Sequence, residues 1–86
     1  MRVVFQKSFE KQYKKLPKKI REQFNIRLTL HLDNQHNPQL HIHKLRGVHT
    51  GLWSLNVTGE IRVIFDKSHE SIITFIAIGS HSELYS

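Results

Sequence analysis

Apolar residues recur at helical spacing in the first third of the chain and cluster in short, β-branched runs through the rest. The run RVVF, at residues 2–5, predicts a strand. Phe9 and Tyr13 then fall on one stripe of a helix, with Ser8 as the expected N-cap and Pro17 as its stop. The pattern therefore predicts an opening strand followed at once by an amphipathic helix.

A second helix is predicted by Ile20, Phe24 and Leu28, which repeat every four residues, and it should end near Asp33. After the loop NQHNP come four β-like runs, which are LHIHKL (40–45), LWSLNV (52–57), EIRVIFD (60–66) and SIITFIAI (71–78), the last two joined by KSHE (67–70). No interior linker divides the chain. This order predicts one α+β domain over residues 1–86, in which an N-terminal strand and a two-helix hairpin pack on a small, twisted antiparallel β-sheet.

The turn VTG decides which side chains share a face of the sheet. A two-residue loop would set apolar residues opposite charged ones, whereas a three-residue loop, with Gly59 left-handed, pairs Asn56 with Glu60. The expected core face then carries Trp53, Leu55, Ile61, Val63 and Phe65. The expected opposite face is polar and open, and it carries Ser54, Asn56, Glu60 and Arg62.

The charge distribution along the chain bears on the function of this fold. The chain has 13 Lys and Arg against seven Asp and Glu, a net charge of +6. Residues 1–32 hold nine of these cations and two of the acids, a balance of +7, while residues 33–86 hold six of the seven histidines. The first part either attracts a polyanion or forms a solvated face, and the histidines of the second part titrate near physiological pH.

The sequence contains no cysteine, which excludes a disulfide framework and thiolate zinc sites. A reducing cytoplasm is therefore the expected compartment. The start MRVVFQKSFEKQ has no signal-peptide segment, and no stretch reaches the roughly 20 apolar residues of a membrane span. We expect a cytoplasmic protein that is not bound to a membrane.

The C-terminal tail and one arginine on a predicted strand provide the first candidate functional residues. His81 and Tyr85 follow Gly79 at the end of the last predicted strand, and they share a face if SELY is helical. The alternative is that His81 caps the terminus and Tyr85 covers apolar surface. Arg62, on the polar face, either holds a phosphate or pairs with Glu60 or Asp66.

The segment HIHKLRGVH is the second candidate. Alternation turns His41 and His43 outward on a strand, with Lys44, Arg46 and His49 close by. Solvation, a metal, anion binding and proton transfer all remain open for such a pair. No acid or cysteine completes a metal site at a suitable spacing, so no metal or other cofactor is expected.

The segments HKLRG, GLWSLNVTGEIRVIF and GSHSELY resemble the RelE/ParE superfamily of type II toxin–antitoxin toxins, and within it the YafQ-like branch. The resemblance extends over nearly the whole chain, and the set of motifs is more specific than any single one. It implies a RelE-like fold. It also implies a toxin that cleaves messenger RNA, often on the ribosome, and that is neutralised by an antitoxin from the same operon.

Matched motif by motif, the resemblance implies four catalytic residues, which are His43, Arg62, His81 and Tyr85. We expect an RNA-binding set around them, which is Lys44, Arg46, His49, Asn56 and Glu60. Asn56 stands where YafQ-like members have a second histidine, and Ala77 stands where they have an arginine on the last strand. The lost arginine removes a phosphate-binding cation, so weakened activity is one expectation.

Cleavage without a metal uses the 2′-hydroxyl of the RNA as nucleophile. We assign His81 as general acid, His43 as general base, Arg62 as phosphate clamp and Tyr85 as a group that stacks on a base. The predicted function is an endoribonuclease, an mRNA interferase that inhibits translation. Two alternatives remain: a ParE-like toxin that inhibits DNA gyrase, and a catalytically weakened relative that binds an antitoxin.

A cognate antitoxin is the expected partner, beside mRNA with or without the ribosome. A basic domain of marginal size suits an acidic, extended chain that folds on binding. We expect the toxin to be monomeric alone and to form a hetero-oligomer with the antitoxin.

Overall fold

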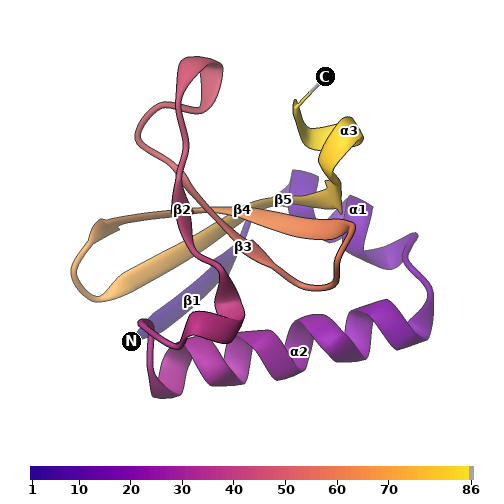
Figure 1. The fold of residues 1–86 in the computed structure, drawn as a ribbon, viewed down its shortest axis with the longest axis horizontal. Coiled ribbons are helices and arrows are strands. Elements are labelled where there is room, and N and C mark those ends of the chain that lie inside the picture. The colour runs from indigo at the N-terminus through magenta and orange to yellow at the C-terminus, as the bar shows by residue number, and fades with distance from the viewer. Residues whose placement is uncertain (86) are drawn as a thin grey trace.

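A computed structural model describes residues 1–85 as a five-stranded sheet with helices (Figure 1). The elements are β1 (Arg2–Phe5), α1 (Lys7–Lys14), α2 (Lys18–Asp33), the 3₁₀ turn η1 (Pro38–Leu40), β2 (His43–Lys44), the 3₁₀ turn η2 (Gly47–His49), β3 (Trp53–Asn56), β4 (Ile61–His69), β5 (Ile72–Ser80) and α3 (His81–Tyr85). The predicted α+β class, with a strand and a helical hairpin ahead of the sheet, is confirmed.

The strands lie in the order β1-β5-β4-β3-β2. The strands from β2 to β5 pair antiparallel, as predicted, but β1 runs parallel to β5, with Phe5 opposite Phe75. The sheet is therefore mixed. The prediction missed the parallel pair because the local pattern carries no information on how such distant segments pair. The predicted connection at residues 67–70 is mostly strand, since β4 continues to His69.

Helices α1 and α2 cover one face of the sheet, and aromatic rings fill the space between them. The rings of Phe9 and Phe24 lie 5.2 Å apart, and they lie 5.7 and 5.3 Å from the ring of Phe75 on β5. All three side chains are buried. The rest of the core cluster comprises Leu40, Leu55, Val57, Val63, Phe65, Ile73 and Ile78.

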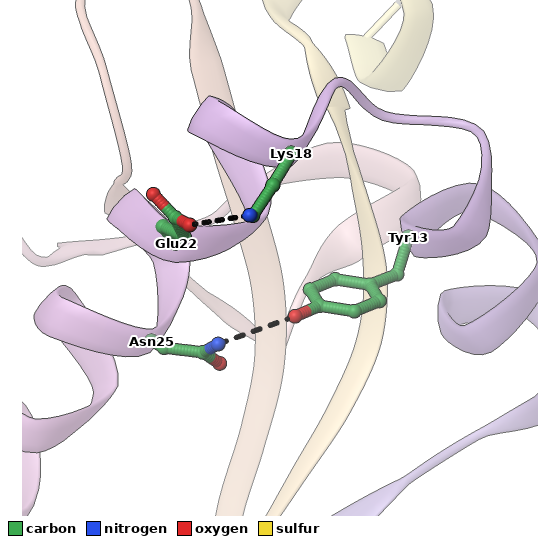
Figure 2. Close-up of polar contacts among 4 residues, drawn as sticks. All are labelled: Tyr13, Lys18, Glu22 and Asn25. Carbon is green, nitrogen blue, oxygen red and sulfur yellow. Dashed lines mark hydrogen bonds and ion pairs between the residues drawn. The ribbon is translucent and has the colours of Figure 1, made fainter.

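Figure 2 shows two polar contacts on the helical hairpin. The Nδ2 of Asn25 donates to the hydroxyl of Tyr13 at 3.3 Å, which links α2 to α1. Lys18 and Glu22 form an ion pair of 3.9 Å, and within residues 1–85 it is the one ion pair of the protein. Because it is exposed, it contributes at most about 1 kcal/mol. The other described cations carry unneutralised charge.

The start of α1 differs from the prediction. Gln6, not Ser8, is the N-cap, and it makes no capping hydrogen bond through its side chain. The Oγ of Ser8 donates instead to the carbonyl of Ile76 at 2.6 Å, which ties α1 to β5. The end of α2 at Asp33 agrees with the prediction.

Strands β3 and β4 pair two residues out of the predicted register. Asn56 lies opposite Arg62 instead of Glu60, and the loop comprises residues 58–60. Gly59 is not left-handed. Because a shift of two residues leaves every side chain on its face, the predicted core residues Leu55, Val63 and Phe65 are all buried.

The predicted strand at residues 40–45 is largely wrong. Leu40 belongs to η1, whose N-cap Asn37 accepts through its side chain from the Gln39 amide at 3.0 Å. His41 follows in the left-handed conformation, with φ of 49°. The alternation therefore breaks before His43, and the two histidines do not form an outward pair on one strand.

Candidate functional site

The candidate site lies on the sheet face opposite α1 and α2. The register sets His43 beside Ser54, and it sets Arg62 between Asn56 and Gly79, so these side chains share a face. The loop between β2 and β3 and the helix α3 rise on this side, while α2 lies beyond the other (Figure 1). We call the surface formed by His43, Ser54, Asn56, Arg62, Ile64 and Ala77 the site face.

The centre of the site face is not open, contrary to the prediction. Ser54 and Ile64 are each only 2% exposed. Ile64 lies opposite Ala77 in the next strand, so apolar groups fill the row beside His43 and Ser54. The polar functions of the site are therefore confined to its margins.

Arg62 has neither of the acid partners considered for it. Within residues 1–85 it forms no ion pair, and its buried Nε has no hydrogen-bond partner. The Oδ1 of Asn56, its cross-strand neighbour, is also buried without a donor. Asp66 instead accepts from the Ser68 amide at 2.8 Å, a bond that lowers the pKa of its carboxyl. Such unpaired buried groups are costly unless a ligand completes them.

The helix α3 holds the two tail residues. Ser80 and Glu83 form a reciprocal capping box, in which the Glu83 carboxylate accepts from the Ser80 amide at 2.8 Å and the Ser80 Oγ accepts from the Glu83 amide at 3.2 Å. Hydrogen bonds from Ser80 lower the pKa of Glu83. The rings of His81 and Tyr85 lie 4.6 Å apart, as expected for a helical SELY.

Gly79 permits the close approach of α3 to β5. A Cβ on Gly79 would lie 3.3 Å from Glu83 Oε1 and 3.5 Å from Leu84 Cδ2. The first of these distances is tighter than ordinary van der Waals contact. The absence of a side chain at this position therefore lets α3 turn back over the end of the strand.

His49 reaches α3 from the β2–β3 loop. Its Nε2 lies 3.1 Å from the carbonyl oxygen of Leu84, and its ring lies 5.8 Å from the ring of Tyr85. Both histidine and leucine are half-buried. Sequence reasoning predicted an RNA contact for His49, whereas the structure gives it a contact with the protein itself.

His43 is exposed on β2, two strands away from Arg62. The residue of β4 in line with His43 is Ile64, so Arg62 is also offset by two residues along the strand. From ordinary strand spacing, their Cα atoms are about 12 Å apart before the side chains extend. His81 follows β5 directly, and its amide donates to the Glu60 carbonyl at 3.2 Å, next to the strand that carries Arg62. Helix α3, which carries His81 and Tyr85, rises on the side of the site face (Figure 1), so all four predicted catalytic residues lie on this side of the sheet.

The predicted RNA-binding residues do not all gather there. Lys44 lies opposite Trp53 on the helix side, with its ammonium 5.9 Å from the centroid of the indole, and Lys67 lies over the same ring at 3.8 Å. Arg46 is exposed at the start of η2, and Glu60 is exposed in the β3–β4 turn. Lys44 is therefore separated from His43 by the sheet.

No three or more His, Asp or Glu side chains of residues 1–85 gather in a way that could hold a metal ion. None of the helices in this range has the length and apolar character needed to cross a bilayer.

Comparisons with known proteins agree with this architecture. The crystal structure of YafQ from E. coli strain BL21(DE3) superposes with a TM-score of 0.84 at 18% identity, over 100% of both chains. A YoeB/ParE toxin from Agrobacterium tumefaciens gives 0.79 at 20% identity, over 94% of this chain and 99% of the other. A RelB–RelE complex from Methanococcus jannaschii gives 0.74 at 22% identity, over 95% and 94%. These superpositions establish a common fold.

No curated protein matches the chain. The model of the family described as "Bacterial toxin of type II toxin-antitoxin system, YafQ" matches residues 1–86, which is the whole sequence. This match over the whole sequence, on a sheet that carries His43 and Arg62 on one face, leads to one conclusion: the chain belongs to the YafQ family of type II toxin–antitoxin toxins.

Proposed function

We propose that this toxin is an endoribonuclease that cleaves messenger RNA by attack of the 2′-hydroxyl on the adjacent phosphodiester. His43 takes the proton of the 2′-hydroxyl, and Arg62 neutralises the charge that develops on the phosphoryl oxygens. His81 gives a proton to the departing 5′-oxygen. The nucleophile belongs to the substrate, so the products are a 2′,3′-cyclic phosphate, later opened to a 3′-phosphate, and a free 5′-hydroxyl.

The observation that carries the proposal is the unpaired state of Arg62. Its guanidinium is half-buried, it has no acid partner within residues 1–85, and its Nε lacks an acceptor. A phosphate supplies both the charge and the acceptor that this group lacks. His43 on the same face and the His81–Tyr85 pair on α3 supply proton-transfer and stacking groups on the same side of the sheet.

The site is poorer in cations than the expected YafQ-like pattern. Ala77 and Ile64 occupy the middle of the site face, where that pattern would supply an arginine. Lys44 lies across the sheet and Arg46 is exposed at the start of η2, so Arg62 is the cation that carries the phosphate. We expect a slow enzyme whose activity depends strongly on Arg62.

The decisive experiment compares purified wild type with His81→Ala, His43→Ala and the control His69→Gln, an exposed histidine at the end of β4. Each protein is incubated with RNA alone and with a translation reaction, and the RNA ends are identified chemically. We expect 2′,3′-cyclic or 3′-phosphate ends from wild type and the control, and at least about a tenfold loss in both site variants, since positioned proton transfer contributes 10²- to 10⁴-fold.

Equal cleavage by His81→Ala would reject the assigned acid. If no RNA is cut in either setting, a supercoiling assay with DNA gyrase examines the ParE-like alternative. If the toxin neither cuts RNA nor inhibits gyrase but still binds its antitoxin, it is the catalytically weakened relative. The ribosome requirement is read directly from the two reaction settings.

An acidic antitoxin that folds on binding is the proposed protein partner, in the cytoplasm. Solved relatives include the E. coli DinJ–YafQ complex and the RelB–RelE complex. In this chain, a groove of about 330 Å³ lies between α1 and α2, with an aromatic lining in which the cations Lys14 and Arg21 outnumber the one acid, Glu10. An amphipathic acidic segment matches both features. Co-expression with the neighbouring gene, followed by size measurement, tests for the expected monomer and hetero-oligomer.

A further inference from the structure

The bond between His49 and Leu84 joins two segments that lie 35 residues apart in the chain. Because a carbonyl oxygen only accepts, the imidazole Nε2 carries the proton and donates it across 3.1 Å. The acceptor lies near the end of α3, where a helix leaves its last carbonyls without internal partners. The β2–β3 loop therefore supplies a C-terminal cap to α3.

The same histidine begins a series of ring contacts that ends at His81. The ring of His49 meets the ring of Tyr85 edge-on, at 5.8 Å and 80°, and the ring of Tyr85 lies 4.6 Å from that of His81. His81 itself is exposed. The position of its ring is therefore set by α3 and by Tyr85 rather than by burial.

The loop that carries His49 is braced internally. The amide and the Oγ1 of Thr50 both donate to the carbonyl of Gly47, at 3.0 and 2.6 Å. The amide of Leu52 donates to the carbonyl of His49 at 3.0 Å, and Gly47 and Gly51 adopt positive φ values of 70° and 91°. Positive φ at two glycines makes a tight tip, which gives His49 a defined place from which to hold α3.

Helix α3 needs such support. It contains five residues, and a helix of this length does not persist by itself in water. The Ser80–Glu83 box and the contact at Gly79 secure its beginning, whereas Tyr85 lies at its other end. His49 is the contact that secures the end at which Tyr85 lies.

We propose that His49 is a positioning residue that locks α3 onto the site face and thereby fixes His81 and Tyr85. The inference rests on the proposed function for its catalytic consequence, but the lock itself is a property of the fold. It replaces the expectation that His49 acts by binding RNA. Loss of a positioning residue lowers the rate of the chemical step, whereas loss of an RNA contact weakens substrate binding.

Three variants separate the two contacts that His49 makes. His49→Gln keeps a donor near the place of Nε2 and removes the ring, His49→Phe keeps a ring and removes the donor, and His49→Ala removes both. His69→Gln is the matched control, because that histidine is exposed on β4. Steady-state cleavage gives kcat and KM for each protein, and amide exchange by NMR reports on residues 81–85.

For His49→Ala we expect kcat to fall about 10- to 100-fold, the loss typical of a misplaced catalytic group, with KM unchanged within about twofold. Amides of α3 should exchange faster, and the ring resonances of His81 and Tyr85 should move. His49→Gln and His49→Phe should each restore part of the loss. A raised KM with unchanged kcat, or wild-type exchange in α3 of His49→Ala, would overturn the inference.

The two proposals fail in different ways. If wild type proves inactive on RNA, the proposed function falls, and the exchange experiment alone decides the lock. Faster exchange in His49→Ala then supports it, and unchanged exchange rejects it.

Discussion

His31 is a buried histidine whose replacement should stabilise the protein. It lies on α2, is 4% exposed, and neither of its ring nitrogens has a hydrogen-bond partner. Its ring meets the ring of Phe65 edge-on at 5.5 Å. Burial lowers the pKa of its imidazole, and the ammonium of Lys67 on β4 lowers it further. His31 is therefore a neutral group whose polar atoms gain nothing from the fold.

The size of the effect follows from two opposing contributions. An unsatisfied buried polar group costs about 1–3 kcal/mol. The edge contact with Phe65 contributes about 0.5–1.5 kcal/mol, which the variant would lose. His31→Leu should therefore raise the free energy of unfolding at pH 7.5 by about 1 kcal/mol, the difference between the centres of these ranges.

The stabilisation of His31→Leu relative to wild type should grow as the pH falls. The pKa of His31 is lowered in the folded protein, so below about pH 6.5 the unfolded state binds a proton that the folded state does not. Wild type therefore loses stability as the pH falls through this range, by at most about 1.4 kcal/mol per pH unit, until the folded-state pKa is reached. Asp66 and Glu83, whose pKa values are also lowered, lose their contribution only in the acid range of carboxylates, equally in both proteins.

Urea unfolding at pH 7.5 and pH 5.5 measures the effect on wild type, His31→Leu and the exposed control His36→Gln. The difference between His31→Leu and wild type should be larger at pH 5.5, and the control should follow wild type. The reasoning would be refuted by a difference that is equal at both pH values, or by destabilisation of His31→Leu at pH 7.5.

Two further predictions concern stability and the helix α3. Arg27→Ala should lower the free energy of unfolding by about 1–3 kcal/mol, measured by urea titration. The reason is that the guanidinium donates to the carbonyls of Gln39 at 2.9 Å and Val57 at 3.4 Å. Arg27→Lys, whose ammonium is a single point donor, should recover only part of the lost stability. Ser80→Ala should weaken α3 locally by about 1 kcal/mol, seen as faster amide exchange, with the melting temperature nearly unchanged. Ser80→Asp should restore the cap, and a Ser80→Ala protein with wild-type exchange would contradict the role of the box.

The sequence predicted most of the features that depend on the local repeat of apolar residues. The alternation of Leu55, Val63 and Phe65 identified the buried face of the central hairpin, even though the register was two residues out. The register depended on Thr58, whose Oγ1 accepts from the Glu60 and Ile61 amides and moves the turn along the chain. Hydrophobic alternation is blind to such a shift, because both registers bury the same side chains.

Other errors came from turn chemistry that was present in the sequence. Asn37 followed by Pro38 is a cap-and-start signal, and it turns Leu40 into the end of a 3₁₀ turn rather than the start of a strand. Ser80 and Glu83 have the spacing of a capping box, which would have predicted α3 directly.

The candidate site was only partly predictable. The two sides of a strand could be assigned, which gathered His43 and Arg62 correctly on one face and, by the same rule, should have separated Lys44 from them. The contact of His49 with Leu84 could not be foreseen, since it depends on how a loop and a helix far apart in the chain fold back over the sheet.

The parallel pairing of β1 with β5 sets the order in which a newly made chain can assemble. Phe5 and Phe75 are partners across this pair. At a rate of synthesis of about 5–20 residues per second, β5 is therefore completed about 4–14 s after β1. Until then, the aromatic side chains of α1 and α2 lack the strand against which they pack. The stretch that carries α3 is made later still, so a nascent chain holds no complete site before its sheet can close.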